Sequence, residues 1–166
     1  MRYLKENTQN ALVQLATYLT TNHLTISCAE SCTGGGLAYA FTSLPGSSAW
    51  FKHSVVTYSN EAKQAMVGVS EETLAQYGAV SAQTVAEMAL GVVSQVGADI
   101  GISISGIAGP DGGSTDKPVG TVWFGFVVND VVNTKQVCFA GDRDAVRLQS
   151  IEYAIEQVVH LLSIHK

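Results

Sequence analysis

Apolar residues follow strand spacing and helix spacing in turn along the whole chain, and this alternation restricts the fold more than any other feature. Five segments have the period of two or the β-branched character of strands: residues 23–29, 50–59, 98–105, 121–128 and 134–140. The last two are separated only by residues 129–133, and a hairpin makes its strands antiparallel. We therefore expect an α/β protein, a three-layer α/β/α sandwich with a mixed five-stranded sheet.

Helix patterns fill the intervals between these strands. Leu12, Leu15, Ala16 and Leu19 form one apolar stripe, and residues 36–44 form a helical run that ends at Pro45 and Gly46. Capping side chains start three others: Asn60 before 61–68, Ser70 before 71–78 and Asp142 before the last helix. Ser81 begins a long helix that ends at Gly97. We find no repeat or linker and expect one domain over residues 1–166.

The composition excludes several classes of function. Hydrophobic residues make up 46% of the chain and the net charge is −5, which argues against nucleic-acid binding. We find no apolar run long enough for a membrane helix, and the first ten residues lack the apolar core of a signal peptide. The cysteines, Cys28, Cys32 and Cys138, are odd in number and lack zinc-ligand spacing, so we expect a cytoplasmic protein without disulfides.

Three polar segments follow three of the expected strands. They are residues 29–36 (AESCTGGG), 57–63 (TYSNEAK) and 105–120 (SGIAGPDGGSTDKPVG). Ligands of such sheets bind beyond the carboxyl ends of the strands, where loops lead into helices. The convergence of the three segments is the main argument for a site there.

The first segment contains two possible nucleophiles, Ser31 and Cys32. The glycines after them, Gly34 to Gly36, open a helix, so their amides could bind an anion or stabilise the oxyanion formed when Ser31 attacks a carbonyl. A simple glycine turn that allows close packing is the alternative, and Cys32 is equally compatible with a small buried apolar residue.

A serine nucleophile needs a base, and Lys63 is the best candidate. The four histidines, His23, His53, His160 and His165, are badly placed for a catalytic triad or a metal site, so we expect no metal. With Asn60 as the cap, Lys63 lies in the first helical turn, where the helix dipole and burial both disfavour its charge. A neutral lysine could take the Ser31 proton, with Tyr58 relaying or orienting. A solvated surface lysine is the alternative.

The third segment contains five glycines and two prolines, more than a connection needs. Its amides could wrap a phosphate or ribose, or the segment could be a flexible surface loop. Arg143 and Arg147 are four residues apart at the start of the last helix, so both could clamp the same phosphate, or pair with nearby carboxylates.

Seven separated motifs together resemble the CinA C-terminal domain family, from about residue 7 to 160. They are AESCTGGG, GSSAWF, VTYSNEAK, ETLAQYGAVS, SISGIAGPDGGS, KPVGTVWF and GDRDAVR. The resemblance implies a three-layer sandwich with a mixed five-stranded sheet. Single-domain members include a nicotinamide-nucleotide amidase, so it also implies hydrolysis of the carboxamide of nicotinamide mononucleotide to nicotinate mononucleotide and ammonia.

By motif, the resemblance places the family's serine, tyrosine and lysine on Ser31, Tyr58 and Lys63. The hypothesis that follows has Ser31 attack the amide carbon while backbone N–H groups of Thr33, Gly34 and Gly35 hold the oxyanion. The nucleotide's phosphate and ribose would be held by one loop and one of the two arginines: Ser105, Gly106, Gly109 and Gly112, with Arg143 or Arg147. This mechanism needs no metal or organic cofactor.

Two other readings stay open at this stage. The chain could be a nucleotide-binding regulatory module without turnover, such as an inactive paralogue, or a partner in DNA uptake or repair, for which no basic cluster is found. The mean hydropathy of +0.19 is high for so short a chain. We therefore also expect a homo-oligomer, with a dimer favoured.

Overall fold

The computed structural model describes residues 3–163, which contain a five-stranded sheet in the order β2-β1-β3-β4-β5. The strands are β1 (Ile26–Glu30), β2 (Phe51–Val56), β3 (Ile100–Gly106), β4 (Thr121–Val128) and β5 (Val131–Cys138). β1 pairs in parallel with β2 and β3, whereas β4 runs antiparallel to β3 and β5. The sheet is therefore mixed, as the hairpin predicted.

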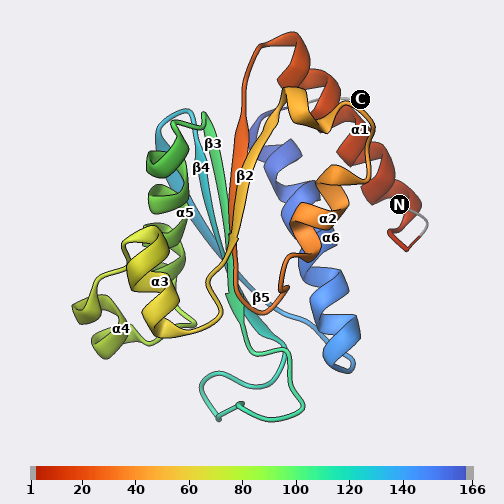
Figure 1. Ribbon diagram of the computed structural model, residues 1–166. Coiled ribbons are helices and arrows are strands. Elements are labelled where there is room, and N and C mark those ends of the chain that lie inside the picture. The colour runs from red at the N-terminus through yellow and green to blue at the C-terminus, as the bar shows by residue number, and fades with distance from the viewer. Residues whose placement is uncertain (1–2, 164–166) are drawn as a thin grey trace.

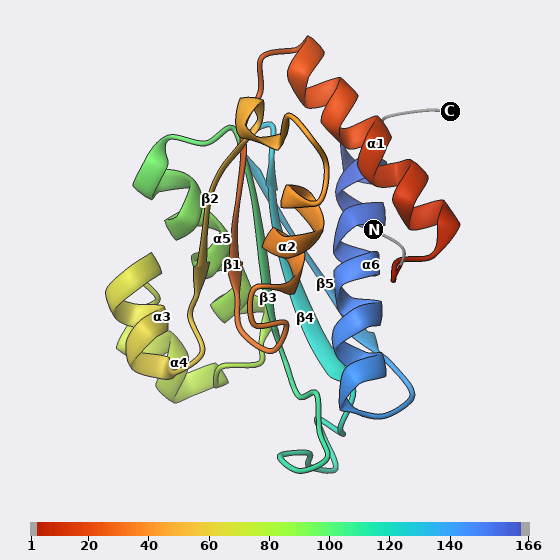
Figure 2. The same cartoon turned by 45° about the vertical axis from the view of Figure 1, so that its right-hand side comes forward.

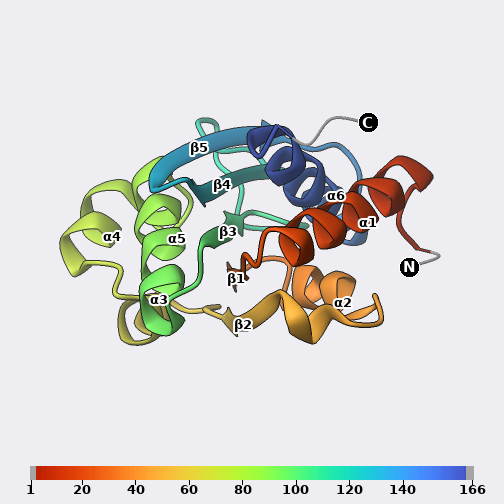
Figure 3. The same cartoon turned by 90° about the horizontal axis from the view of Figure 1, so that it is seen from above.

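Helices cover both faces of this sheet (Figures 1 and 3). One layer contains α1 (Glu6–Thr21), α2 (Gly36–Thr42) and α6 (Arg143–Leu161), and the other contains α3 (Asn60–Val67), α4 (Glu71–Tyr77) and α5 (Ala82–Val96). A short 3-10 turn, η1 (Ser47–Ala49), precedes β2. The predicted α/β/α sandwich is confirmed. Within residues 3–163, no helix is both long enough and apolar enough to cross a bilayer.

The central strand β1 is buried on both faces, because helices cover the sheet on either side. Ile26 and Cys28 pack into the core under α1, α2 and α6, and Ala29 packs into the core under α5. The strand starts later than expected, at Ile26, and the amide and hydroxyl of the preceding Thr25 donate to the Asp99 carboxylate. It continues to Glu30, which places Ser31 directly at its carboxyl end.

Two of the three expected helix caps are present, and Ser81, expected to begin the long helix, caps α5. Ser70, Ser81 and Asp142 each accept a hydrogen bond from the backbone amide three residues further on. The prediction of Asn60 was wrong by one residue: Ser59 caps α3, its hydroxyl accepting from the Ala62 amide. Serine and asparagine are equally good caps, so the preceding serine could take the role. Lys63 is consequently the fourth residue of α3.

The hairpin between β4 and β5 is tighter than the sequence suggested. Residues 129–133 were expected to form the connection, but the turn is only Asn129 and Asp130, and β5 begins at Val131. Both turn residues have positive φ angles, 51° and 61°. A two-residue hairpin turn requires this conformation, and Asn and Asp tolerate it better than most residues.

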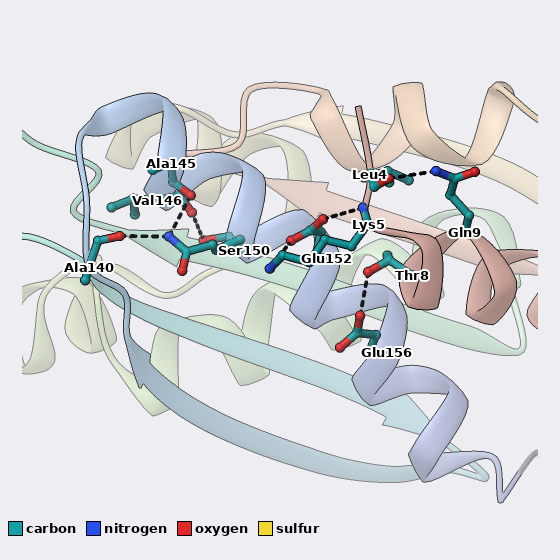
Figure 4. A network of polar contacts seen from close by, with 11 residues as sticks. Leu4, Lys5, Thr8, Gln9, Ala140, Ala145, Val146, Ser150, Glu152 and Glu156 are labelled. Carbon is teal, nitrogen blue, oxygen red and sulfur yellow. Dashed lines mark hydrogen bonds and ion pairs between the residues drawn. The ribbon is translucent and has the colours of Figure 1, made fainter. Parts of the chain in front are cut away.

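Polar contacts tie α1 to α6 and thereby hold the outer helices together (Figure 4). The Lys5 amide donates to Oε1 of Glu152 at 2.8 Å, and the Lys5 ammonium lies 2.9 Å from Oε2. One helical turn further on, the Thr8 hydroxyl donates to Glu156. These bonds anchor the middle of α6, which begins at Arg143 and carries Arg147 one turn further on.

Candidate active site

The carboxyl ends of β1, β2 and β3 meet at one edge of the sheet, below which the connection from β3 to β4 extends (Figures 1 and 2). A cavity of about 190 Å³ lies at this edge. Its walls are formed by Ser31, Cys32, Tyr58, Lys63, Ala79, Val80, Ser105, Gly106, Ala108 and Arg143. All three polar segments of the sequence contribute to this cavity, so their expected convergence is present.

Ser31 and Lys63 are in direct contact at the inner end of this cavity. The Nζ atom of Lys63 lies 3.1 Å from the Ser31 hydroxyl and 2.7 Å from the carbonyl oxygen of Thr57. A neutral amine can satisfy both contacts at once, donating to Thr57 and accepting the hydroxyl proton of Ser31. Such a contact would allow Lys63 to act as a base toward Ser31.

Lys63 is one of the most buried polar side chains, with 1% of its surface exposed. No carboxylate of residues 3–163 forms a salt bridge with it. Burial lowers the pKa of the Lys63 ammonium from its ordinary 10.5, although the neighbouring Cys32 acts in the opposite direction. The alternative of a solvated surface lysine is therefore wrong.

Cys32 lines the cavity beside Ser31 but is a poor competing nucleophile. Burial raises the pKa of its thiol from 9.0 to about 11. The reactive form of cysteine is the thiolate, so the Cys32 side chain is almost entirely unreactive at neutral pH.

The glycines after Ser31 form the expected turn into α2, but their amides are already bonded within the protein. The Gly34 amide donates to the Ser31 carbonyl, and the Gly35 amide donates to the carboxylate of Glu30. This differs from the expectation that Gly34 and Gly35 would bind substrate. Within residues 3–163, neither Cys32 nor Thr33 donates a backbone hydrogen bond from its amide. Thr33 is fully buried and lies outside the cavity wall, so the amide of Cys32, which lines the cavity, is the available donor of the turn.

Tyr58 and Arg143 stand together at the mouth of the cavity. Nη1 of Arg143 donates to the carbonyl of Gly109 at 2.7 Å, and Nη2 donates to the Tyr58 hydroxyl at 3.1 Å. Tyr58 is 62% exposed, and its hydroxyl bonds to Arg143 instead of the Ser31–Lys63 pair. It therefore lies beside the entrance and not in the expected relay position.

Arg147 contacts the turn that follows Ser31 and not the entrance of the cavity. Its Nη2 donates to the Thr33 carbonyl at 3.3 Å, and its Nη1 lies 3.8 Å from Asp144. Neither Arg147 nor Thr33 lines the cavity. The two arginines thus do not converge, because Arg143 faces the entrance and Arg147 braces the back of the turn.

The glycine-rich segment contributes unevenly. The first residues of the segment, Ser105 and Gly106, line the cavity, and the Ser105 hydroxyl donates to the carbonyl of Ala79. Gly109 is linked to Arg143 through its carbonyl, whereas Gly112 lies outside the cavity wall. Sequence reasoning assigned no role to the apolar wall formed by Ala79 and Val80. These residues carry no reactive group, although they lie within the ETLAQYGAVS motif.

Other candidate sites do not combine reactive groups in this way. Neither His23, His53 nor His160 lines the cavity, and His165 lies outside the described residues. In the chain from 3 to 163, no three His, Cys, Asp or Glu side chains are grouped to hold a metal ion. A larger hollow of about 470 Å³ between α3 and α5 contains the titratable side chain Glu87, which is already bonded to Ser70 and Thr73.

The chain is similar in sequence to enzymes of nucleotide metabolism. It is 61% identical over 133 residues to the nicotinamide-nucleotide amidohydrolase PncC of Enterobacter agglomerans, covering 79% of this chain and 80% of the relative. It is 56% identical to PncC of Escherichia coli K12, covering 86% and 87%. A putative competence-damage inducible protein of Clostridium novyi is 51% identical, but this chain spans only 34% of its length.

Solved structures and a family model agree with these relatives. The competence damage-inducible protein A of Klebsiella pneumoniae superposes with a TM-score of 0.91 at 39% identity, covering 96% of this chain and 99% of that one. The model of the CinA C-terminal domain matches residues 8–162. The chain therefore belongs to the CinA C-terminal domain family.

Proposed function

We propose that this protein hydrolyses the carboxamide of nicotinamide mononucleotide to nicotinate mononucleotide and ammonia, in pyridine-nucleotide recycling. The observation that carries the proposal is the contact between the Ser31 hydroxyl and the buried Lys63 amine. The amidohydrolases named above, which match most of this chain, supply the substrate class.

In the first half of the reaction, neutral Lys63 takes the proton of Ser31 as the serine oxygen bonds to the amide carbon. The amide of Cys32, which lines the cavity, stabilises the oxyanion. The proton then passes from Lys63 to the departing nitrogen, the C–N bond breaks, and ammonia leaves. In the second half, Lys63 takes a proton from a water molecule as the water oxygen attacks the acyl carbon. Lys63 then returns this proton to the Ser31 oxygen as the C–O bond to serine breaks, and the product acid loses its proton to solvent to give the carboxylate.

Arg143 is the arginine that fits the phosphate, because it is at the mouth of the cavity and Arg147 is not. Its guanidinium is held by Gly109 and Tyr58, so it is oriented before the nucleotide arrives. We assign the pyridine ring to the inner wall of Ala79 and Val80, next to Ser105 and Gly106. Gly112, Gly34 and Gly35 then shape the surrounding backbone without contacting the substrate.

Ser31→Ala tests this function. It should abolish ammonia release from nicotinamide mononucleotide while the protein stays folded and still binds the nucleotide, measured by calorimetry. If the unmutated protein binds the nucleotide without releasing ammonia, the chain is a non-catalytic module or inactive paralogue. If Ser31→Ala keeps its turnover, the nucleophile is another residue.

We also propose a homodimer in the cytoplasm. The three cysteines are free thiols, which suits a reducing compartment. Exposed apolar side chains such as Val13, Tyr39 and Val131 supply surface that a second copy could cover. A sedimentation mass equal to one chain at micromolar concentration would contradict the dimer.

A further inference from the structure

Glu30 is the last residue of β1 and immediately precedes Ser31. Its side chain is fully buried. Oε2 accepts hydrogen bonds from the amides of Gly35 at 3.2 Å and Leu37 at 3.0 Å, and Oε1 accepts from the amide of Ala38 at 2.9 Å. The carboxylate thus lies inside the loop that it closes.

A buried carboxylate is costly unless its oxygens are fully hydrogen bonded. No lysine or arginine of residues 3–163 forms a salt bridge with Glu30. Its partners are instead the first amides of α2, which would otherwise lack acceptors at the helix start. The bonds to these neutral donors are charge-assisted. They connect the end of β1 to the start of α2, and Ser31 lies in the turn between the two.

The same bonds decide which amides of the turn can act on a substrate. Glu30 occupies the donors of Gly35, Leu37 and Ala38, so a substrate anion cannot bind at the start of α2. Within the turn, the Gly36 amide donates to the Thr33 carbonyl, and the Ser31 amide donates to the carbonyl of Ile104 in the neighbouring strand β3. The amide of Cys32 directly follows Ser31, stays free of these bonds and lies at the cavity wall.

We infer that Glu30 is a positioning residue for the serine chemistry proposed above. Its carboxylate holds the turn in the one shape that keeps the Ser31 hydroxyl on the Lys63 amine and leaves the Cys32 amide free for the oxyanion. Glu30 touches neither the substrate nor the reacting atoms. The inference rests on the proposed function, because it concerns the alignment of that nucleophile.

Glu30→Gln removes the charge and keeps the shape. A glutamine has one acceptor oxygen, so its NH₂ group must face at least one backbone amide donor, and the turn has to shift. Misplacing reacting groups by about 1 Å can cost on the order of 100-fold in rate, so we expect kcat to fall by about tenfold or more with KM within about twofold.

Glu152→Gln is the matched control, because Glu152 is also a buried glutamate but holds Lys5 at the contact between α1 and α6 (Figure 4). It should lower the melting temperature and leave kcat near the parental value. A second readout is the rate at which a fluorophosphonate labels Ser31, located by peptide mass spectrometry. Labelling should slow in Glu30→Gln and not in Glu152→Gln.

The inference is overturned if Glu30→Gln keeps kcat within about twofold of the parent, or if it raises KM with kcat unchanged. If Glu30→Gln does not fold, Glu30→Asp decides by the same criteria, since it keeps the charge but is too short to reach all three amides. Failure of the parent to label at Ser31 would instead refute the proposed nucleophile, so the two failures are distinguishable.

Discussion

Lys63 is only 1% exposed, and no carboxylate of residues 3–163 forms a salt bridge that would stabilise its charge. Its lowered pKa means that a larger fraction is neutral at a given pH than for a surface lysine. We expect kcat to rise with pH along a limb set by Lys63, below the ordinary value of 10.5. A pH–rate profile measures this limb.

Lys63→Arg tests whether Lys63 acts as a base or only anchors the substrate. Arginine keeps the positive charge but cannot lose its proton in this pH range, so turnover should collapse and the limb should vanish. Near-parental kcat in Lys63→Arg would mean that the lysine only anchors the substrate, and a water molecule would have to be the base.

Cys32 also leads to a prediction at the scale of single residues. Because its thiol stays protonated at neutral pH, Cys32→Ala should keep most of the activity, and iodoacetamide should react slowly with the native protein at this position. The reverse pattern, an active Ser31→Ala and an inactive Cys32→Ala, would move the nucleophile to the cysteine.

At the scale of elements, α6 carries two arginines one turn apart that contact different parts of the protein. Arg143 contacts Gly109 and Tyr58, whereas Arg147 contacts Thr33. Arg143→Ala should raise KM for the nucleotide by roughly 10- to 150-fold, corresponding to about 1.5–3 kcal/mol for a charge-assisted bond. It should change little with the nucleoside, which lacks the phosphate. Arg147→Ala should instead lower kcat for both substrates, because it loosens the Thr33 carbonyl. Steady-state kinetics with both substrates would contradict this assignment if the two effects were exchanged.

The contact between α3 and α5 sets the position of Lys63. Gly91 lies where an added methyl group would overlap the carbonyl oxygen of Val67 in α3. Glycine to alanine normally favours a helix by about 1 kcal/mol, but overpacking costs about 1–3 kcal/mol. We therefore expect Gly91→Ala to lower both the free energy of unfolding in urea and kcat. Gln95→Ala, at an exposed site of α5, is the control and should change neither.

The layers and the strands were predictable from the sequence because apolar periodicity reports directly which faces are buried. The hairpin turn was not, since Val131 and Val132 continue the strand while the expectation placed them in the connection. The role of Glu30 was not predictable either, because the sequence does not indicate that a glutamate side chain in a polar turn accepts from amides five to eight residues later. Ala79 and Val80 reach the cavity only through the packing of α4 and α5.

At the scale of the whole molecule, the buried lysine couples global stability to pH. The unfolded chain holds the proton of Lys63 up to 10.5, whereas the folded protein loses it at lower pH. The free energy of unfolding should therefore rise with pH across this interval, by about 1.4 kcal/mol for each unit of pKa depression. The raised pKa values of Cys28 and Cys32 act oppositely at alkaline pH.

Comparison with Lys63→Met isolates the lysine contribution, because both proteins contain the same thiols. The stability of the parent relative to Lys63→Met, measured by urea unfolding, should improve from neutral to alkaline pH. A difference that stays constant with pH would mean that Lys63 keeps its ordinary pKa in the folded protein.

The order of the strands carries a consequence for how such proteins diverge. From β1 the chain crosses to β2 through α2 on one face of the sheet, and returns to β3 through α3, α4 and α5 on the other. The two connections lie on opposite faces of the sheet and diverge at the carboxyl end of β1. This strand order by itself leaves a crevice there. Loss of the serine would leave that crevice intact. A homologue without Ser31 is therefore expected to bind the nucleotide without hydrolysing it.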